Sequence, residues 1–199
     1  KNLFLTFIRY NCIKPLKCLI LKVNFLDLNK GLSYSASIGN YKIVKLLLKN
    51  NADIHFENEQ PLLFASSNGH FDIVKLLLKN GSLNFQKNKN LELASSNGHY
   101  KVVELLLKNE FPFNEFYMGN SLQLASSNGH YKVVKLLLKY KKNIWNNYEK
   151  ALIEALTNKH YKIVELFIEN GVIHFKDDYL LQQSSCDGKY KIVELLLKN

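Results

Sequence analysis

The sequence contains few prolines and cysteines. It has three of each in 199 residues, and the cysteines (Cys12, Cys18 and Cys186) do not have the spacing of metal ligands. An odd number of widely separated cysteines excludes a fully paired disulfide framework and indicates free thiols in a reducing compartment. We therefore expect an intracellular, cytoplasmic protein.

The sequence also has no long uncharged apolar run. A membrane-spanning helix needs about 18 such residues in succession, and the most apolar stretch, residues 3–23, is interrupted by Arg9, Lys14 and Lys17. The same charges make this stretch a poor signal peptide. We therefore expect no membrane segment within the chain. Because the chain starts at Lys1 and not at a methionine, a targeting segment upstream of it stays open.

Arginine is almost absent, although the chain is basic. Lysine and arginine together number 27 against 17 acidic residues, which gives a net charge of +10, but Arg9 is the only arginine. Proteins read guanine edges and phosphates largely with the planar fork of arginine. The lysine-rich charge therefore disfavours nucleic acid as a partner.

Internal repetition is the main feature that the sequence does have. The phrase ASSNGH occurs at residues 65–70, 94–99 and 125–130, and each copy runs into a leucine-rich segment such as FDIVKLLLKN. We call the glycine position of this phrase the marker. Complete and decayed copies place markers about every thirty residues, at Asn11, Gly39, Gly69, Gly98, Gly129, Lys159 and Gly188. A period kept over so many copies indicates a tandem array.

Each copy predicts two helices joined at the marker. In the first, helix 1, a leucine lies seven positions before the marker and a small residue four positions before it, which favours close packing on one face. These residues are Leu32, Leu62, Leu91, Leu122, Leu152 and Leu181, with Ser35, Ala65, Ala94, Ala125, Ala155 and Ser184. A marker glycine ends helix 1 because glycine reaches positive φ without steric cost. Helix 2 follows, with lysines on one face and apolar residues elsewhere, so only a stack of copies buries its leucines.

The run PLLFASSNGHFDIVKLLLKNGS at residues 61–82 resembles the ankyrin repeat, with its Pro-Leu, paired small residues, Gly-His step, leucine run and Asn-Gly ending. This resemblance implies an all-α ankyrin-repeat solenoid of stacked antiparallel helix pairs with short finger loops between the pairs. It covers residues 30–199 well and residues 1–29 poorly, so we expect the latter to be a degenerate N-terminal repeat or a cap. The expected units are about 30–59, 60–88, 89–119, 120–149, 150–178 and 179–199.

The copies depart from the family pattern in two respects. They average about 30 residues where the family has about 33, with the shortening in the fingers, and the Thr-Pro-Leu-His opening of helix 1 is mostly absent. Short fingers, the phrase ASSNGH and heavy use of Asn, Lys and Ile are similar to the ankyrin proteins of giant DNA viruses that infect amoebae, the mimivirus-like group. Slime-mould ankyrin proteins are the second resemblance. For a giant virus, the expected location is the host cytoplasm.

The histidines do not predict a metal site or an active site. They take the same slot in consecutive copies (His70, His99, His130 and His160), so stacking places them about 8–10 Å apart, whereas ligands of one zinc ion each lie about 2.0–2.1 Å from the metal. We expect each imidazole to bond backbone groups near the start of helix 2. Catalysis requires one asymmetric cluster, whereas this chain repeats its serines and histidines. We therefore predict a non-enzymatic protein without a metal or cofactor.

The resemblance implies a protein partner, because ankyrin proteins bind partners through the finger tips and the exposed face of helix 1. We expect a monomeric scaffold whose concave surface carries both serines and the asparagine of each ASSNGH phrase. The helix 1 residues carried over from the family pattern are Ser67, Asn68, Ser96, Asn97, Ser127 and Asn128. Because these pairs are identical, we expect specificity from aromatic residues of the variable fingers, namely Phe116, Tyr117, Trp145 and Tyr148.

Two alternative functions stay open. The lysines of helix 2 could bind nucleic acid or an acidic partner, although a solvated outer face is their simpler explanation. The array could also be the targeting arm of a larger adaptor, such as a ubiquitin-ligase substrate receptor, whose other parts lie outside residues 1–199.

Overall fold

The computed structural model describes residues 3–82, 87–109, 115–140, 145–171 and 177–198, with the side chains of 87–88, 115–117, 145–147 and 177–178 outside the description. Within these ranges the regular secondary structure is entirely helical, which confirms the predicted all-α class. The helices are α1 (Leu3–Arg9), α2 (Ile13–Ile20), α3 (Phe25–Ser37), α4 (Tyr41–Lys49), α5 (Phe56–Ser67), α6 (Phe71–Lys79), α7 (Lys87–Ser96), α8 (Tyr100–Lys108), α9 (Glu115–Ser127), α10 (Tyr131–Lys139), α11 (Trp145–Thr157), α12 (Tyr161–Glu169), α13 (Asp177–Cys186) and α14 (Tyr190–Lys198).

The turn at each marker has the backbone conformation that the sequence predicts. The five marker glycines have φ between +66° and +79°, and the markers Asn11 and Lys159 have φ of 56° and 61°. In the turns at Gly39, Gly69, Gly129, Lys159 and Gly188, the N–H after the marker donates to the carbonyl of the small residue of helix 1, as from His130 to Ala125 at 2.9 Å. At Asn11 the N–H of Cys12 donates to the carbonyl of Phe7, which holds the same position, at 2.9 Å. The pair α1–α2 therefore turns at Asn11 in the same way as the glycine-containing repeats.

The core lies where helix 1 and helix 2 of successive pairs meet. The small residue four positions before each marker is fully buried in every repeat from α3 to α13. The leucine seven positions before the marker is buried in α3, α5, α7, α9 and α11, and Leu181 in α13 is half-buried. Helix 2 contributes its apolar stripe, as Ile73, Val74 and Leu77 do in α6. A small residue beside a leucine allows the close helix approach that a stacked array needs.

Polar bridges tie the start of helix 1 to the segment that follows helix 2 in the pairs α3–α4 and α5–α6. The Oδ1 atom of Asn29 in α3 accepts a hydrogen bond from the N–H of Asp53, which follows α4, at 2.8 Å. In the following repeat the fully buried Glu59 takes the equivalent position, where its carboxylate accepts from the Ser82 hydroxyl and lies 2.5 Å from Nδ1 of His55. Buried carboxylates require such partners, so these bridges hold the finger backbone against its neighbour.

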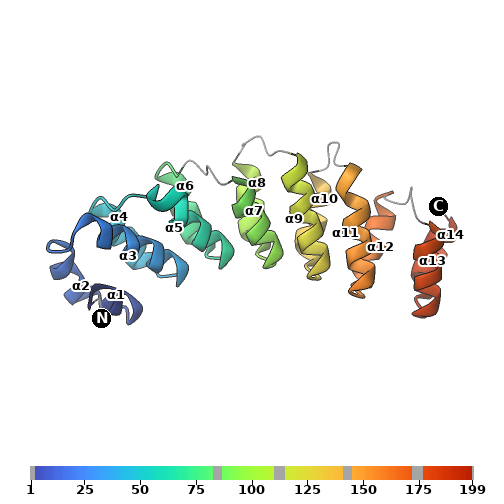
Figure 1. The fold of residues 1–199 in the computed structure, drawn as a ribbon, viewed down its shortest axis with the longest axis horizontal. Helices are drawn as coiled ribbons and strands as arrows, with labels where there is room; N and C mark the ends of the chain where they lie inside the picture. Colours follow the sequence, from blue (N-terminus) through green and yellow to red (C-terminus); the bar gives the residue numbers. More distant parts are fainter. Residues whose placement is uncertain (1–2, 83–86, 110–114, 141–144, 172–176, 199) are drawn as a thin grey trace. The chain divides into compact units, whose positions relative to one another are not determined.

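The helices group into two units, each of them a stack of helix pairs. Unit 1 comprises residues 1–94 and 101–109, and unit 2 comprises residues 95–100 and 110–199. Within unit 1, α3 packs against α1, α4 and α5, and α6 packs against α4 and α5 (Figure 1). Within unit 2, α9 packs against α10 and α11, and α12 packs against α10, α11 and α14. Helix 1 thus contacts helix 1 and helix 2 contacts helix 2 along each stack, which is a repeat solenoid.

Candidate partner-binding surface

The ASSNGH phrase divides into a buried part and an exposed part. Its alanine and first serine are fully buried, whereas the second serine is half-buried and the asparagine is exposed. Our expectation that both serines face the surface is therefore wrong for the first one, which is Ser66, Ser95 or Ser126. The reason is helical periodicity, since this serine lies four residues after the buried leucine and shares its face. The predicted pairs, beginning at Ser67, Ser96 and Ser127, lie at the edge of the surface.

The exposed asparagines also link neighbouring repeats. The Nδ2 group of Asn128 donates to the carbonyl of Ser96 at 2.9 Å and to its hydroxyl at 3.1 Å. Asn158 reaches the Ser127 hydroxyl at 3.5 Å, and Asn68 donates to the Phe64 carbonyl of its own helix at 2.9 Å. The Ser-Asn pairs therefore act partly as scaffold, and they present the remaining acceptor groups to solvent.

A second row of residues accompanies the asparagines on helix 1, and our sequence analysis missed it. These residues lie five positions before the marker, and the asparagines lie one position before it. Because the two positions are four residues apart, they share a face. We call these two positions together the helix 1 face. The residues five positions before the marker are Tyr34, Phe64 and Leu93 in unit 1, and Leu124, Glu154 and Gln183 in unit 2. Leu124 is 38% exposed and the others are half-buried. These residues vary from apolar to polar, whereas the position before the marker is asparagine in four of the six repeats and Ile38 or Asp187 in the other two.

The four aromatic candidates from the fingers have different outcomes. Phe116 and Tyr117 lie in the first turn of α9 and Trp145 begins α11, but their side chains lie outside the described residues. Tyr148 is 2% exposed, and its ring meets that of Phe167 edge to face, with centroids 6.3 Å apart. Burial raises the pKa of Tyr148 above its usual value. We therefore correct the prediction for Tyr148, which packs in the core and presents no ring to a partner.

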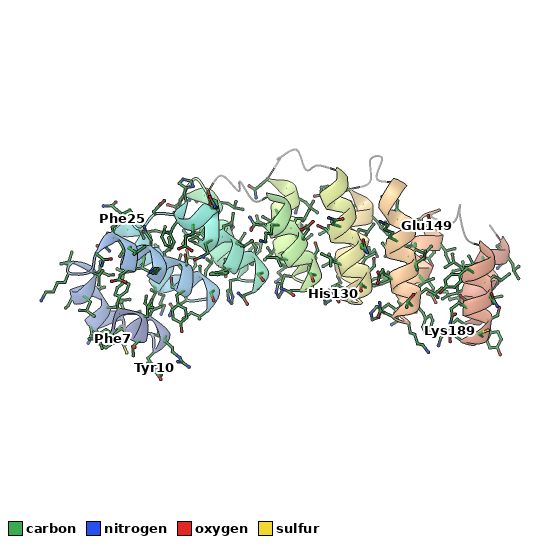
Figure 2. The ribbon with its side chains drawn as sticks, in the orientation of Figure 1. Phe7, Tyr10, Phe25, His130, Glu149 and Lys189 are labelled. Atoms are coloured by element: carbon green, nitrogen blue, oxygen red, sulfur yellow. The ribbon has the colours of Figure 1, made fainter. Side chains whose placement is uncertain are left out.

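The repeated histidines connect each repeat to the preceding one. The Nε2–H groups of His70, His130 and His160 donate to the carbonyls of Ser37, Ser96 and Ser127 at 2.9, 2.8 and 3.0 Å. His130 lies at the turn between α9 and α10 (Figure 2). The expectation of backbone partners is confirmed, but their expected place near the start of helix 2 is wrong, because the imidazole points across the junction. Each ring instead satisfies a C-terminal carbonyl of the previous helix 1.

Each of these imidazoles also lies directly over a marker glycine. A Cβ atom added at Gly39, Gly98 or Gly129 would lie only 2.5, 2.6 or 2.7 Å from an atom of His70, His130 or His160. The sequence follows the same rule at every junction. Where the marker is Gly39, Gly69, Gly98 or Gly129, the next repeat has a histidine directly after its own marker position. Where the marker is Asn11 or Lys159, the next repeat has Asn40 or Lys189 at that position. This pairing was visible in the sequence, but its physical cause is a contact between residues about thirty positions apart.

Within the described residues, no group of three or more His, Cys, Asp or Glu side chains is placed to hold a metal ion. Cys12, Cys18 and Cys186 are free thiols, and Cys18 and Cys186 are exposed. Among the described helices, none has both the length and the apolar character to cross a membrane.

Comparison with known proteins gives one family. A family model described as "Ankyrin repeats (3 copies)" matches residues 32–117, 91–178 and 122–199. Together these overlapping matches extend from Leu32 in α3 to the C-terminal residue. No curated protein matches the chain, so the resemblance to giant-virus and slime-mould proteins stays a prediction.

Proposed function

Because this chain belongs to the ankyrin-repeat family, whose repeats are a general protein–protein interaction module, we propose that it is a non-enzymatic scaffold. It binds a partner protein through the helix 1 face and the adjoining fingers. The observation that carries this proposal is the composition of that face in the repeats of α5, α7 and α9, where an at least partly exposed apolar residue lies one turn before an exposed asparagine. Interfaces commonly combine apolar contact area with hydrogen-bonding groups in this way.

The rigidity of the surface supports the same proposal. The helix 1 face is supported from below by buried leucines and alanines, and Asn128 is bonded across the repeat junction to Ser96. A partner that docks on such a preformed surface loses little free energy to ordering of the scaffold. In unit 2, Leu124 in the last turn of α9 and Asn128 directly after that helix are exposed, and they form the centre of the proposed contact.

The test compares two leucine-to-glutamate variants in affinity capture. The purified chain is immobilised and exposed to an extract of the cells that produce it, as wild type, as Leu124→Glu and as Leu21→Glu. Leu21 is 84% exposed after α2, outside the helix 1 face, and it supplies the same charge change. A buried charge at an interface centre is expected to weaken binding at least about tenfold.

Proteins that wild type and Leu21→Glu retain, and that Leu124→Glu loses, are the expected result. Circular dichroism of each variant checks that the helices are intact. If Leu124→Glu retains the same proteins as wild type, the helix 1 face is not the binding surface. Equal losses from both variants would attribute the effect to charge and would contradict the proposal as well.

A basic surface on helix 2 supports a second candidate function. Lys132, Lys135 and Lys139 line a groove of about 310 Å³ with Tyr100 and Leu136. The Lys132 ammonium lies 6.0 Å from the Tyr100 ring centroid, and none of the three lysines has an acidic partner among the described residues. Such a groove suits a polyanion. Retention on heparin across a salt series tests it, and Lys135→Gln is expected to reduce the logarithmic salt slope by about one; an unchanged slope would remove this candidate.

A further inference from the structure

Two repeat junctions lack the histidine bridge because their marker carries a side chain. The repeat after Asn11 has Asn40, and the repeat after Lys159 has Lys189, at the position where His70, His130 and His160 lie over a marker glycine. The imidazole occupies the space between the marker and the end of the previous helix 1. At these two junctions that space contains other groups.

The chain fills the junction after Lys159 with its own carboxylate. Asp187 accepts hydrogen bonds from Nε2 of Gln183 and from the Tyr161 hydroxyl, both at 3.1 Å, and its other oxygen lies 3.9 Å from Nζ of Lys159. Lys189, labelled in Figure 2, places its ammonium 4.3 Å from the Tyr161 ring centroid. One internal anion is thus surrounded by two cations and two neutral donors.

The junction after Asn11 lacks this carboxylate, and Asn11 and Asn40 stand where the other junction has Lys159 and Lys189. Its cations are Arg9 and Lys42, which come from different positions of the repeat. A cleft of about 690 Å³ opens there, and its lining includes Arg9, Lys42, Tyr34, Tyr41, Ile38 and Asn40. Ile38 takes the slot of Asp187, one position before the marker, and it is 41% exposed. The Asn40 amide donates to Oδ1 of Asn11 at 3.0 Å, which holds it beside the marker. Neither Arg9 nor Lys42 has an acidic partner among the described residues.

The chemistry of this cleft suits a carboxylate from another molecule. Arg9 is the only arginine of the chain, and a guanidinium binds a carboxylate with two parallel hydrogen bonds where a lysine offers a point charge. Its Cζ atom lies 5.9 Å from the ring centroid of Tyr10, which follows the last residue of α1 (Figure 2). The phenol groups of Tyr34 and Tyr41 add donors and apolar surface for the stem of an acidic side chain.

We propose that the cleft between α1 and the α3–α4 turn binds an aspartate or glutamate side chain of a partner polypeptide, through Arg9 and Lys42. Tyr34 and Ile38 belong to the helix 1 face, so a polypeptide lying on that face in unit 1 extends directly into the cleft. The assignment of the carboxylate to a polypeptide rests on the proposed function. The cleft's preference for a carboxylate rests only on its own residues.

The first experiment replaces Ile38 with the residue that the chain uses at the other exceptional junction. Ile38→Asp supplies an internal carboxylate, whereas Ile38→Asn has the same shape without the charge. Fluorescence anisotropy measures binding of a short glutamate-rich peptide and of its glutamine twin to the full chain. We expect wild type and Ile38→Asn to bind the glutamate peptide similarly, and Ile38→Asp to bind it about tenfold more weakly. Equal affinity of Ile38→Asp and Ile38→Asn would overturn the proposal.

The second experiment locates the bound peptide. Because the chain has one arginine, the Nε–Hε group of Arg9 gives a single guanidinium signal in a ¹⁵N correlation spectrum. The glutamate peptide is expected to shift this signal saturably, and the glutamine twin is not. Arg9→Lys keeps the charge but loses the fork, so its affinity should fall by about threefold or more. An unmoved Arg9 signal at saturating peptide would place the binding elsewhere and refute the assignment.

Matched lysine variants separate the cleft from general charge. Lys42→Gln and Lys49→Gln remove the same charge from opposite ends of α4, but only Lys42 lines the cleft. We expect only Lys42→Gln to weaken the glutamate peptide. Equal weakening by both, or tighter binding of a single-stranded oligonucleotide than of the peptide, would favour a nonspecific polyanion surface and overturn the proposal. Leu124→Glu should leave peptide affinity unchanged, so a failure of the helix 1 face and a failure of the cleft are distinguishable.

Discussion

The contact between Gly129 and His160 allows the pairing of marker and histidine to be tested by substitution. Gly129 has φ of 76°, and a Cβ atom there would lie 2.7 Å from Cε1 of His160. The left-handed conformation costs an alanine about 1–2 kcal/mol, and overpacking of this kind costs about 1–3 kcal/mol more. Gly129→Ala is therefore expected to lower the free energy of unfolding by about 2–5 kcal/mol.

Two further variants separate these contributions. Gly171 has φ of 75° with no heavy atom within 4 Å of its added Cβ, so Gly171→Ala should show the backbone cost of about 1–2 kcal/mol alone. His160→Asn introduces the residue type that Asn40 has at the equivalent position. It loses a hydrogen bond of 3.0 Å to the Ser127 carbonyl, worth about 0.5–1.5 kcal/mol. In the double variant Gly129→Ala/His160→Asn the overlap is relieved, so the combined loss should fall short of the sum by about 1–3 kcal/mol.

Urea unfolding followed by far-UV circular dichroism measures these differences. Because repeat arrays can unfold in more than one step, native-state amide exchange of α9 to α12 provides the local free energies alongside the global midpoint. Equal losses for Gly129→Ala and Gly171→Ala would show that the imidazole imposes no steric restriction. Strict additivity of the double variant would refute the contact as the reason for the pairing.

Two further predictions follow from the polar groups of unit 2. The Ser126 hydroxyl is fully buried with no hydrogen-bond partner among the described residues, so Ser126→Ala should raise the free energy of unfolding in urea by about 1 kcal/mol. The neighbouring control Ser127→Ala should change it by less than about 0.5 kcal/mol. A lower free energy of unfolding for Ser126→Ala would mean that the hydroxyl is hydrogen-bonded. The pKa of Asp187 is lowered by its hydrogen bond from Gln183 and further by Tyr161 and nearby lysines. Because its pKa is lowered on folding, the Asp187 carboxylate stabilises the folded state at pH values above its unfolded-state pKa of 3.8. This stabilisation is lost as the pH falls through the folded-state pKa. Amide protection in α14 should therefore fall more steeply on acidification below about pH 4 in wild type than in Asp187→Asn, and parallel pH profiles would contradict this role.

Local sequence patterns were sufficient to predict the helix pairs and their turns. The markers adopt positive φ whether they are Gly39, Asn11 or Lys159, because a tight turn between two helices requires that conformation of whichever residue occupies it. The leucine and the small residue of helix 1 are buried because their four-residue and seven-residue spacings place them on one face. The helical periodicity of helix 1 also predicts that Ser126 is buried and that Leu124 is exposed, although we did not make these two predictions.

The misplaced aromatic residue shows where local patterns were insufficient. We assigned Tyr148 to a finger, but α11 begins at Trp145, so Tyr148 lies within a helix and faces Phe167 of α12. Composition alone did not place that boundary, because a short finger and a first helical turn contain the same polar and aromatic residues. The length of the finger is settled by how far α11 must extend to pack on its neighbours.

The sequence by itself determined the repeat length, the helix pairs, the buried stripe and the family, since each depends on residues close together in the chain. Only the tertiary structure decided what each repeat presents to the next. It directs His130 to the carbonyl of Ser96, thirty-four residues away, and it brings Arg9 of α1 and Lys42 of α4 to one cleft. These relations depend on how one repeat stacks on another, and packing distances and directions between repeats are not encoded in the periodicity within a repeat.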